Sequence, residues 1–210
     1  MTENRTRPGI AFNSARFLTS ATRLDQCPPD EGAEVAFTGR SNSGKSSALN
    51  AITRNSKLAR TSKTPGRTRL INFFSLSEPG ARLVDLPGYG FARVSRETQQ
   101  AWQKHLAHYL EQRESLKGMT LIMDSRRPLS EFDWMLIEWC QHHELPMLLL
   151  LTKIDKLNRN MARQQLREVQ TAVRELPCIT GVEPFSALKG NGVEETRRYL
   201  ETWLTGPHSD

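Results

Sequence analysis

An eight-residue stretch near the start of the chain has the composition of a phosphate-binding loop. Residues 39–46 read GRSNSGKS and fit the pattern G-x-x-x-x-G-K-[ST]. Gly39 and Gly44 allow the backbone to curl so that successive N–H groups face inward, towards the positive end of a following helix. Lys45 can reach the terminal phosphates, and the Ser46 hydroxyl can bind Mg²⁺. The residues expected to contact phosphate are Gly39, Arg40, Ser41, Asn42, Ser43, Gly44, Lys45 and Ser46.

A second candidate element, residues 83–88, reads LVDLPG. Its apolar part predicts a strand that delivers Asp85 at its carboxyl end, where open α/β sheets bind ligands. We expect Asp85 to hold a Mg²⁺-bound water and Gly88 to let the backbone approach the γ-phosphate. Leu86 and Pro87 complete this contact segment. The pattern D-x-x-G is common in proteins, but its distance after the phosphate loop strongly favours a role in phosphate and Mg²⁺ binding here.

A third element selects the base. Residues 148–155 read LLLLTKID, a buried strand that ends in polar residues. Asp155 offers a carboxylate to the N1–H and the exocyclic amine of guanine, a donor pair that adenine lacks on that edge. Lys153 can lay its stem along the base and brace the phosphate loop. Thr152 stands where Asn is commoner, and Ile154 completes the motif, which favours GTP over ATP.

A fourth short element follows the last expected strand. It consists of Phe185, Ser186 and Ala187. Ser186 and the N–H of Ala187 are placed to meet the O6 of guanine. The position of this element in chain order, rather than its composition, supports the interpretation.

A threonine before Asp85 should complete the Mg²⁺ shell and sense the γ-phosphate. We favour Thr68, because residues 65–66 are Pro-Gly and predict a mobile turn just before it, and Thr64 is the alternative. Residues 54–69 contain six basic side chains and no acid. A solvated loop is the ordinary interpretation; a loop ordered by the γ-phosphate would be a nucleotide-controlled RNA-binding surface.

These elements require a sheet whose strands end at one edge. Short apolar runs predict strands at residues 34–38, 70–76, 82–85, 119–124, 147–152 and 179–185. Helical spacing of apolar residues lies between them, with Ser130 and Asn191 as expected N-caps. The alternation predicts an α/β fold with a mostly parallel six-stranded sheet and helices on both faces. Residues 77–80 are short enough to make one antiparallel hairpin.

Length and composition suit one soluble domain. The chain has 210 residues, which we divide into an N-terminal extension (1–30), a main domain (31–205) and a tail (206–210). The longest strongly apolar run, residues 147–151, is far too short to span a membrane, so we expect a cytoplasmic protein without a membrane partner. The net charge of +6 and the pI of about 9.5 permit nucleic-acid binding. We expect its three cysteines to be reduced: Cys27, Cys140 and Cys178.

Taken together, these motifs resemble the EngB family of bacterial GTPases. The segments that carry the resemblance are GRSNSGKS (39–46), TPGRT (64–68), DLPGYG (85–90), DSRR (124–127), TKID (152–155) and FSA (185–187). The match covers roughly residues 12–205. It implies a Ras-like P-loop fold, Mg²⁺-dependent GTP binding and hydrolysis to GDP, and a role in large ribosomal subunit assembly with effects on cell division and septation. It assigns Ser46 and Thr68 to Mg²⁺. It also adds a group of GTP-binding residues: Gly66, Arg67, Thr68, Arg69 and Leu70.

The residues expected to act in hydrolysis are Lys45, Thr68 and Asn42. Many GTPases place a water-orienting Gln directly after D-x-x-G, whereas this chain has Tyr89, so we expect slow intrinsic turnover. Related GTPases use an Asn at the position of Asn42 to help bind K⁺ near the phosphates. An Asn that is present only because it suits a tight turn explains the residue equally well. The K⁺ interpretation and the turn interpretation both stay open.

Two other classes of function compete with a GTP-hydrolysing switch. One is a binding module whose hydrolysis is incidental. The other is a small-molecule P-loop kinase, which would lack the guanine motif that ends at Asp155. The expected partners of a switch are the RNA and proteins of the large ribosomal subunit or its precursor, and we expect the chain to be a monomer.

Overall fold

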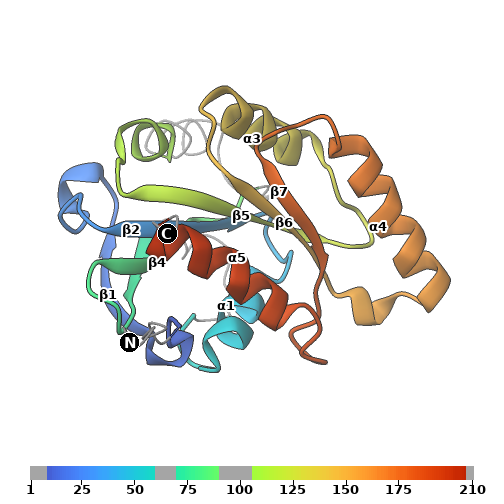
Figure 1. The fold of residues 1–210 in the computed structure, drawn as a ribbon, viewed down its shortest axis with the longest axis horizontal. Coiled ribbons are helices and arrows are strands. Elements are labelled where there is room, and N and C mark those ends of the chain that lie inside the picture. Colours follow the sequence, from blue (N-terminus) through green and yellow to red (C-terminus); the bar gives the residue numbers. More distant parts are fainter. Residues whose placement is uncertain (1–8, 60–69, 90–105, 207–210) are drawn as a thin grey trace, which may run out of the picture.

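The computed structural model of the chain describes residues 9–59, 70–89 and 106–206. These residues form a seven-stranded sheet flanked by helices (Figure 1). The strands are β1 (Arg16–Ala21), β2 (Ala33–Gly39), β3 (Ile71–Ser75), β4 (Ala81–Asp85), β5 (Leu116–Asp124), β6 (Met147–Thr152) and β7 (Ile179–Pro184). The α-helices include α1 (Lys45–Thr53), α3 (Glu131–His142), α4 (Arg159–Val173) and α5 (Val193–Thr205), and residues 106–112 are also helical. The short 3₁₀ helices are η1 (Phe12–Ser14), η2 (Leu24–Gln26) and η3 (Ile154–Lys156).

The strands lie in the order β1-β3-β4-β2-β5-β6-β7. The last five in this order pair in parallel. β3 is antiparallel to both of its neighbours, so it is the strand that runs against the rest. The mostly parallel α/β sheet is therefore confirmed, and so is the antiparallel hairpin around residues 77–80.

The predicted number of six strands is wrong, because β1 adds a seventh at the edge of the sheet. β1 lies within the segment that the sequence assigned to an N-terminal extension. Its first three residues are exposed, and its register with β3 is irregular between Phe17 and Thr19. An exposed, irregular edge strand has neither the continuous apolar run of a buried strand nor a clean alternation.

Alternate side chains of the central strands enter two cores, one on each face of the sheet. Val35 and Phe37 of β2 pack in a core with α1 and α5. Ala36, which lies between them, faces a second core with α3, α4 and residues 106–112. Because strands buried on both faces are apolar throughout, this arrangement explains their continuous apolar runs.

One of the two expected helix caps is confirmed. The Ser130 side chain accepts a hydrogen bond from the N–H of Asp133, whose carboxylate in turn accepts from the N–H of Ser130. The expected cap at Asn191 is wrong. α5 starts one residue later, with Gly192 as its N-cap at φ 76°, and the Asn191 carbonyl instead accepts from the N–H of Ser186. Glycine tolerates this left-handed conformation at no steric cost.

The three cysteines are free thiols, as predicted. Among the described residues, no helix is both long enough and apolar enough to cross a membrane.

A buried ion cluster lies at the amino ends of the central strands. Glu34 of β2 is fully buried, and its carboxylate is 2.7 Å from Arg82 Nε and 2.6 Å from Arg113 Nη2. The Tyr109 hydroxyl donates to the same carboxylate at 2.8 Å. The two guanidinium groups also donate to the backbone carbonyl of Pro29, which fastens the loop before β2 to the sheet. Each buried charge in the cluster therefore has an opposite charge and hydrogen-bond partners, which is the condition for tolerating it.

Replacing Glu34 with alanine should destabilise the fold strongly. Arg82 would then be buried without a counter-charge, and Arg113 would keep only Asp30, whose Oδ1 lies 3.5 Å from its Nε. Leaving a buried charge unpaired in this way costs about 3–5 kcal/mol in comparable cases. Urea unfolding followed by circular dichroism measures the change in the free energy of unfolding. The matched control is Glu175→Ala, which removes a 2.9 Å ion pair with Arg174. The side chain of Glu175 is 83% exposed and that of Arg174 is 70% exposed. The control should unfold nearly as the wild type does, and equal losses in the two variants would contradict the role of the cluster.

Candidate nucleotide-binding site

The phosphate loop joins β2 to α1 with the geometry that its sequence predicts. Gly39 ends β2, and a Cβ on this residue would lie 2.4 Å from the carbonyl oxygen of Ile122, so only glycine fits. Gly44 is the N-cap of α1 at φ 104°. α1 begins at Lys45, with Ser46 in its first turn. The first-turn N–H groups of a helix have no acceptor within the helix, so this end of α1 is suited to bind an anion.

The second element lies directly against this loop. Arg40 forms a parallel bridge with Tyr89, and the N–H of Ser41 donates to the Tyr89 carbonyl at 2.7 Å. A Cβ on Gly88 would lie 3.2 Å from the Gly39 carbonyl oxygen, so the two backbones approach closely here. The N–H of Leu86 donates to Phe37 at 2.9 Å. Residues 85–88, Pro87 included, thus run beside the loop, and their predicted contacts with Mg²⁺ and the γ-phosphate stay predictions.

Lys45 and Asp85 form an ion pair at the centre of the phosphate site. Their side chains are only 10% and 7% exposed. Asp85 reaches this position because it ends β4 in parallel register with Phe37 of β2. The pairing places the two charges that the sequence assigned to phosphate and Mg²⁺ in direct contact.

The guanine motif is attached to the phosphate loop by two side chains. Thr152 ends β6, and its hydroxyl donates to the carbonyl of Ser43 in the phosphate loop. Lys153 Nζ donates to the carbonyl of Asn42 at 2.6 Å. The predicted bracing of the phosphate loop by Lys153 is therefore present.

The third and fourth elements contact each other through Asp155 and Ser186. The Ser186 hydroxyl donates to Asp155 Oδ1 at 2.6 Å, and the N–H of Ile154 donates to the Phe185 carbonyl at 3.2 Å. The hydrogen bond from Ser186 is the main cause that lowers the pKa of Asp155 below its ordinary value. Asp155 is thus ionised at neutral pH and can accept hydrogen bonds from a guanine edge. Ala187 is exposed and follows directly in the chain.

Part of the predicted site falls outside the described residues. Gly66, Arg67, Thr68 and Arg69 lie there, together with the alternative Thr64. Leu70 is the first described residue after this gap and precedes β3. The expected roles of these residues in GTP and Mg²⁺ binding stay predictions.

The side chain of Tyr89 takes a position that the sequence did not predict. Its ring is buried and stacks on Phe132 with centroids 5.6 Å apart, and its hydroxyl donates to Asp133 of α3. Burial, followed by the negative charge of Asp133, raises the pKa of Tyr89. The phenol is therefore a neutral group directed at α3, at the chain position where many GTPases place a water-orienting Gln.

Two acidic residues beside the site had no role in the sequence analysis. Asp124 ends β5, and its Oδ2 is 2.9 Å from Lys153 Nζ. Asp133 caps α3 and accepts from Tyr89. Asp124 is an acidic residue at the end of an apolar strand, which is the same sequence pattern that identified Asp85. The capping pattern after Ser130 identified the start of α3 but gave no indication of the contact with Tyr89.

The described residues offer oxygen donors for Mg²⁺ but no closed metal cage. Ser46 and Asp85 come from the two elements that meet at the phosphate loop. Among the described residues there is no group of three or more His, Cys, Asp or Glu side chains that could hold a metal. This donor set fits Mg²⁺, which commonly binds through one or two protein oxygens together with substrate phosphates.

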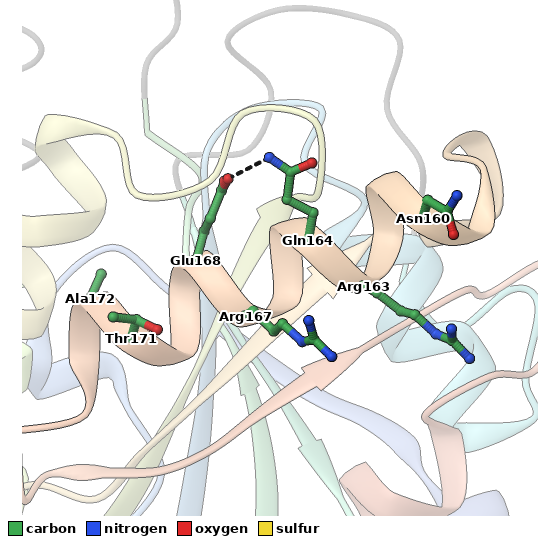
Figure 2. Close-up of a pocket in the computed structure, with 7 residues that line it drawn as sticks. All are labelled: Asn160, Arg163, Gln164, Arg167, Glu168, Thr171 and Ala172. Atoms are coloured by element: carbon green, nitrogen blue, oxygen red, sulfur yellow. Dashed lines mark hydrogen bonds between the residues drawn. The ribbon is translucent and has the colours of Figure 1, made fainter.

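A separate surface pocket lies along α4 (Figure 2). This helix packs beside β7, the strand at the edge of the sheet (Figure 1). Its volume is about 640 Å³. The described residues that line it all belong to α4 and are Asn160, Arg163, Gln164, Arg167, Glu168, Thr171 and Ala172. None of them was predicted to bind nucleotide, so this pocket is distinct from the site at the phosphate loop.

Comparisons with known proteins agree with this geometry. A family described as "50S ribosome-binding GTPase" matches residues 34–153. The "Probable GTP-binding protein EngB" of Aeromonas salmonicida (strain A449) is 53% identical, over 92% of this chain and 89% of the relative. The protein of the same name from Coxiella burnetii (strain RSA 493 / Nine Mile phase I) is 50% identical, over 97% and 98%.

Solved structures share the fold. The crystal structure of a probable GTP-binding protein engB superposes with a TM-score of 0.64 at 22% identity, over 80% of this chain and 97% of that one. A GTP-binding protein from Sulfolobus solfataricus in complex with GDP gives a TM-score of 0.56 at 24% identity, over 82% and 52%. With the sequence relatives and the P-loop architecture, the assignment follows: the chain belongs to the EngB family of P-loop GTPases.

Proposed function

We propose that the chain is a Mg²⁺-dependent GTP switch that acts in the cytoplasm in assembly of the large ribosomal subunit. In this proposal the GTP-bound form docks on the assembling particle, hydrolysis to GDP releases it, and effects on cell division and septation follow. The observation that carries the nucleotide part is the convergence of two kinds of site at one sheet edge. Lys45 and Asp85 lie on the phosphate side, and Asp155 and Ser186 lie on the guanine side. Lys153 joins the two sides through Asn42.

The residues of the site suggest how hydrolysis would proceed. Phosphoryl transfer requires positioning and charge neutralisation more than covalent chemistry. Lys45 and the first-turn N–H groups of α1 would bind the phosphates. Ser46, Asp85 and Thr68 would hold Mg²⁺, which supplies positive charge against the phosphate oxygens. Because Tyr89 replaces a water-orienting Gln and donates its hydroxyl to Asp133, turnover by the protein alone should be slow.

The ribosomal part of the proposal is supported by the description of the matching family and by charge. Of the basic segment 54–69, Arg54 and Lys57 are among the described residues and both are exposed. α4 adds a second basic surface with the exposed residues Arg159, Arg163 and Arg167, of which Figure 2 shows the last two. Exposed positive side chains are suited to bind RNA phosphates, with an affinity that falls as salt rises. Arg54 would have to exchange its 3.3 Å pair with the exposed Glu194 for such a contact.

Changing Asp155 to Asn should weaken binding of guanine nucleotides and favour xanthine nucleotides. The substitution removes the negative charge that accepts hydrogen bonds from the N1–H and the amine of guanine. We expect the Kd for GDP to rise about 10- to 100-fold, as for the loss of one hydrogen bond to a charged group. Titration with fluorescent mant-GDP and competition by GDP and XDP measure this change. An unchanged affinity for GDP would show that Asp155 does not read the base.

Asn42→Gly separates the two interpretations of Asn42. The residue has φ 65°, a conformation that glycine adopts freely, so the variant keeps the turn and removes the amide. The ion hypothesis predicts that the wild type hydrolyses GTP about tenfold or more faster in K⁺ than in Na⁺ at equal ionic strength, and that the variant loses this difference. Phosphate release measured in both salts decides the question. Equal wild-type rates in K⁺ and Na⁺ would favour the turn alone.

Sedimentation with ribosomal subunits tests the switch. The protein should co-migrate with large-subunit precursors in the presence of a non-hydrolysable GTP analogue and dissociate with GDP. Thr68→Ala, designed to impair hydrolysis, should remain bound in GTP where the wild type is released. Co-migration that is indifferent to the nucleotide would contradict the switch. Release of Thr68→Ala in GTP as complete as that of the wild type would favour a binding module whose hydrolysis is incidental.

A further inference from the structure

The carboxylate of Asp124 lies beside the guanine motif without belonging to it. Asp124 is the last residue of β5, and its partner in the parallel pairing with β6 is Thr152, the last residue of β6. The N–H of the next residue, Ser125, donates to the Thr152 carbonyl at 2.9 Å, so the two strand ends are in firm register. This pairing directs Asp124 towards the residue that follows Thr152, which is Lys153.

Lys153 is held by acceptors from two different segments. Its ammonium group donates to Asp124 Oδ2 at 2.9 Å and to the Asn42 carbonyl at 2.6 Å. The backbone of Lys153 adopts a left-handed conformation with φ 58°. A lysine side chain has several rotatable bonds, and two fixed acceptors restrict it to one arrangement.

The Asp124 carboxylate is itself fixed and charged. Its Oδ1 accepts from Arg126 Nε at 2.9 Å and from the Arg126 N–H at 3.1 Å. Hydrogen bonds from Arg126 first, and then from Lys153, hold the pKa of Asp124 well below its ordinary value despite its partial burial. Asp124 and Arg126 both belong to the DSRR segment (124–127), to which the sequence assigned no role apart from its part in the family resemblance.

We propose that Asp124 is a positioning residue for nucleotide binding, which holds Lys153 against the phosphate loop so that the lysine stem lies ready to contact the guanine base. The inference rests on the proposed guanine site. A free lysine would lose its conformational freedom when the nucleotide binds, and this loss would weaken affinity. With Asp124 present, the side chain is ordered beforehand. The effect should be the same for GTP and GDP, because both carry the same base.

The alternative is that Asp124 only anchors the turn that contains Arg126. In that case the contact with Lys153 would be incidental, and removing Arg126 would have the same effect as removing the carboxylate. The chain therefore offers a matched control, because Arg126→Gln removes the guanidinium hydrogen bonds to Asp124 and leaves the contact with Lys153 in place. The Arg126 side chain is 52% exposed, so the control should fold normally.

The test compares Asp124→Asn with Arg126→Gln in titrations with mant-GDP and a mant-labelled non-hydrolysable GTP analogue. We expect Asp124→Asn to raise both Kd values about three- to tenfold, the usual consequence of ordering one long side chain on binding. The kcat at saturating GTP should stay unchanged. Arg126→Gln should bind as the wild type does. Asp124→Glu, which keeps the charge, should recover most of the lost affinity, and urea unfolding verifies that each variant is folded.

A double-mutant cycle tests whether Asp124 acts through Lys153. In a Lys153→Met background, Asp124→Asn should cause no further loss of affinity, because the ammonium that it positions is gone. The proposal is overturned if the loss is equal in both backgrounds, if Arg126→Gln reproduces it, or if Asp124→Asn binds as the wild type does. Failure of the guanine site itself would be seen separately, as unchanged GDP affinity in Asp155→Asn.

Discussion

Parallel pairing in register among β4, β2, β5 and β6 is the constraint on which the nucleotide site depends. This register sets Asp85 opposite Phe37 and Asp124 opposite Thr152. It also brings Gly39 so close to β5 that a Cβ would collide with the carbonyl of Ile122. A shift of one residue in any of these strands would turn its terminal side chain to the opposite face of the sheet. The side chains of the site therefore converge because of backbone pairing, before any contact among them forms.

The same strands carry two different kinds of ion pair at their two ends. At the amino ends, Glu34 and its arginines are buried, and all are held by several hydrogen bonds. At the carboxyl ends, Lys153 and Asp124 are partly exposed and make contacts that a nucleotide can extend. β4 carries a charged residue at each end, with Arg82 near its start and Asp85, whose pair with Lys45 is also buried, at its end. Because these charged groups lie at opposite ends of the strands, the cluster around Glu34 can stay intact when a nucleotide binds at the carboxyl ends.

The sequence was most informative where one residue type satisfies a strict local demand. The glycines of the phosphate loop, Asp85 and the Ser130 cap were all predictable, since each follows from a backbone conformation or a strand end. β1 was missed because an exposed edge strand has little apolar pattern, and the cap at Asn191 was wrong because Gly192 could adopt the left-handed turn instead. Contacts such as Tyr89 with Asp133 depend on how α3 packs beside the phosphate loop, which no local pattern encodes.

Two residues with left-handed backbones meet where the phosphate and guanine sides join. Asn42 has φ 65° and Lys153 has φ 58°, and the ammonium of the second donates to the carbonyl of the first. Such conformations cost about 1–3 kcal/mol each outside glycine and persist only where the surrounding contacts enforce them. Asn is among the residues that tolerate the conformation best, whereas Lys has no such preference. The strain at Lys153 is therefore balanced by its contacts, of which that with Asp124 is the charged one. An acid at the end of β5 thus helps to explain why a lysine can occupy this backbone position at all.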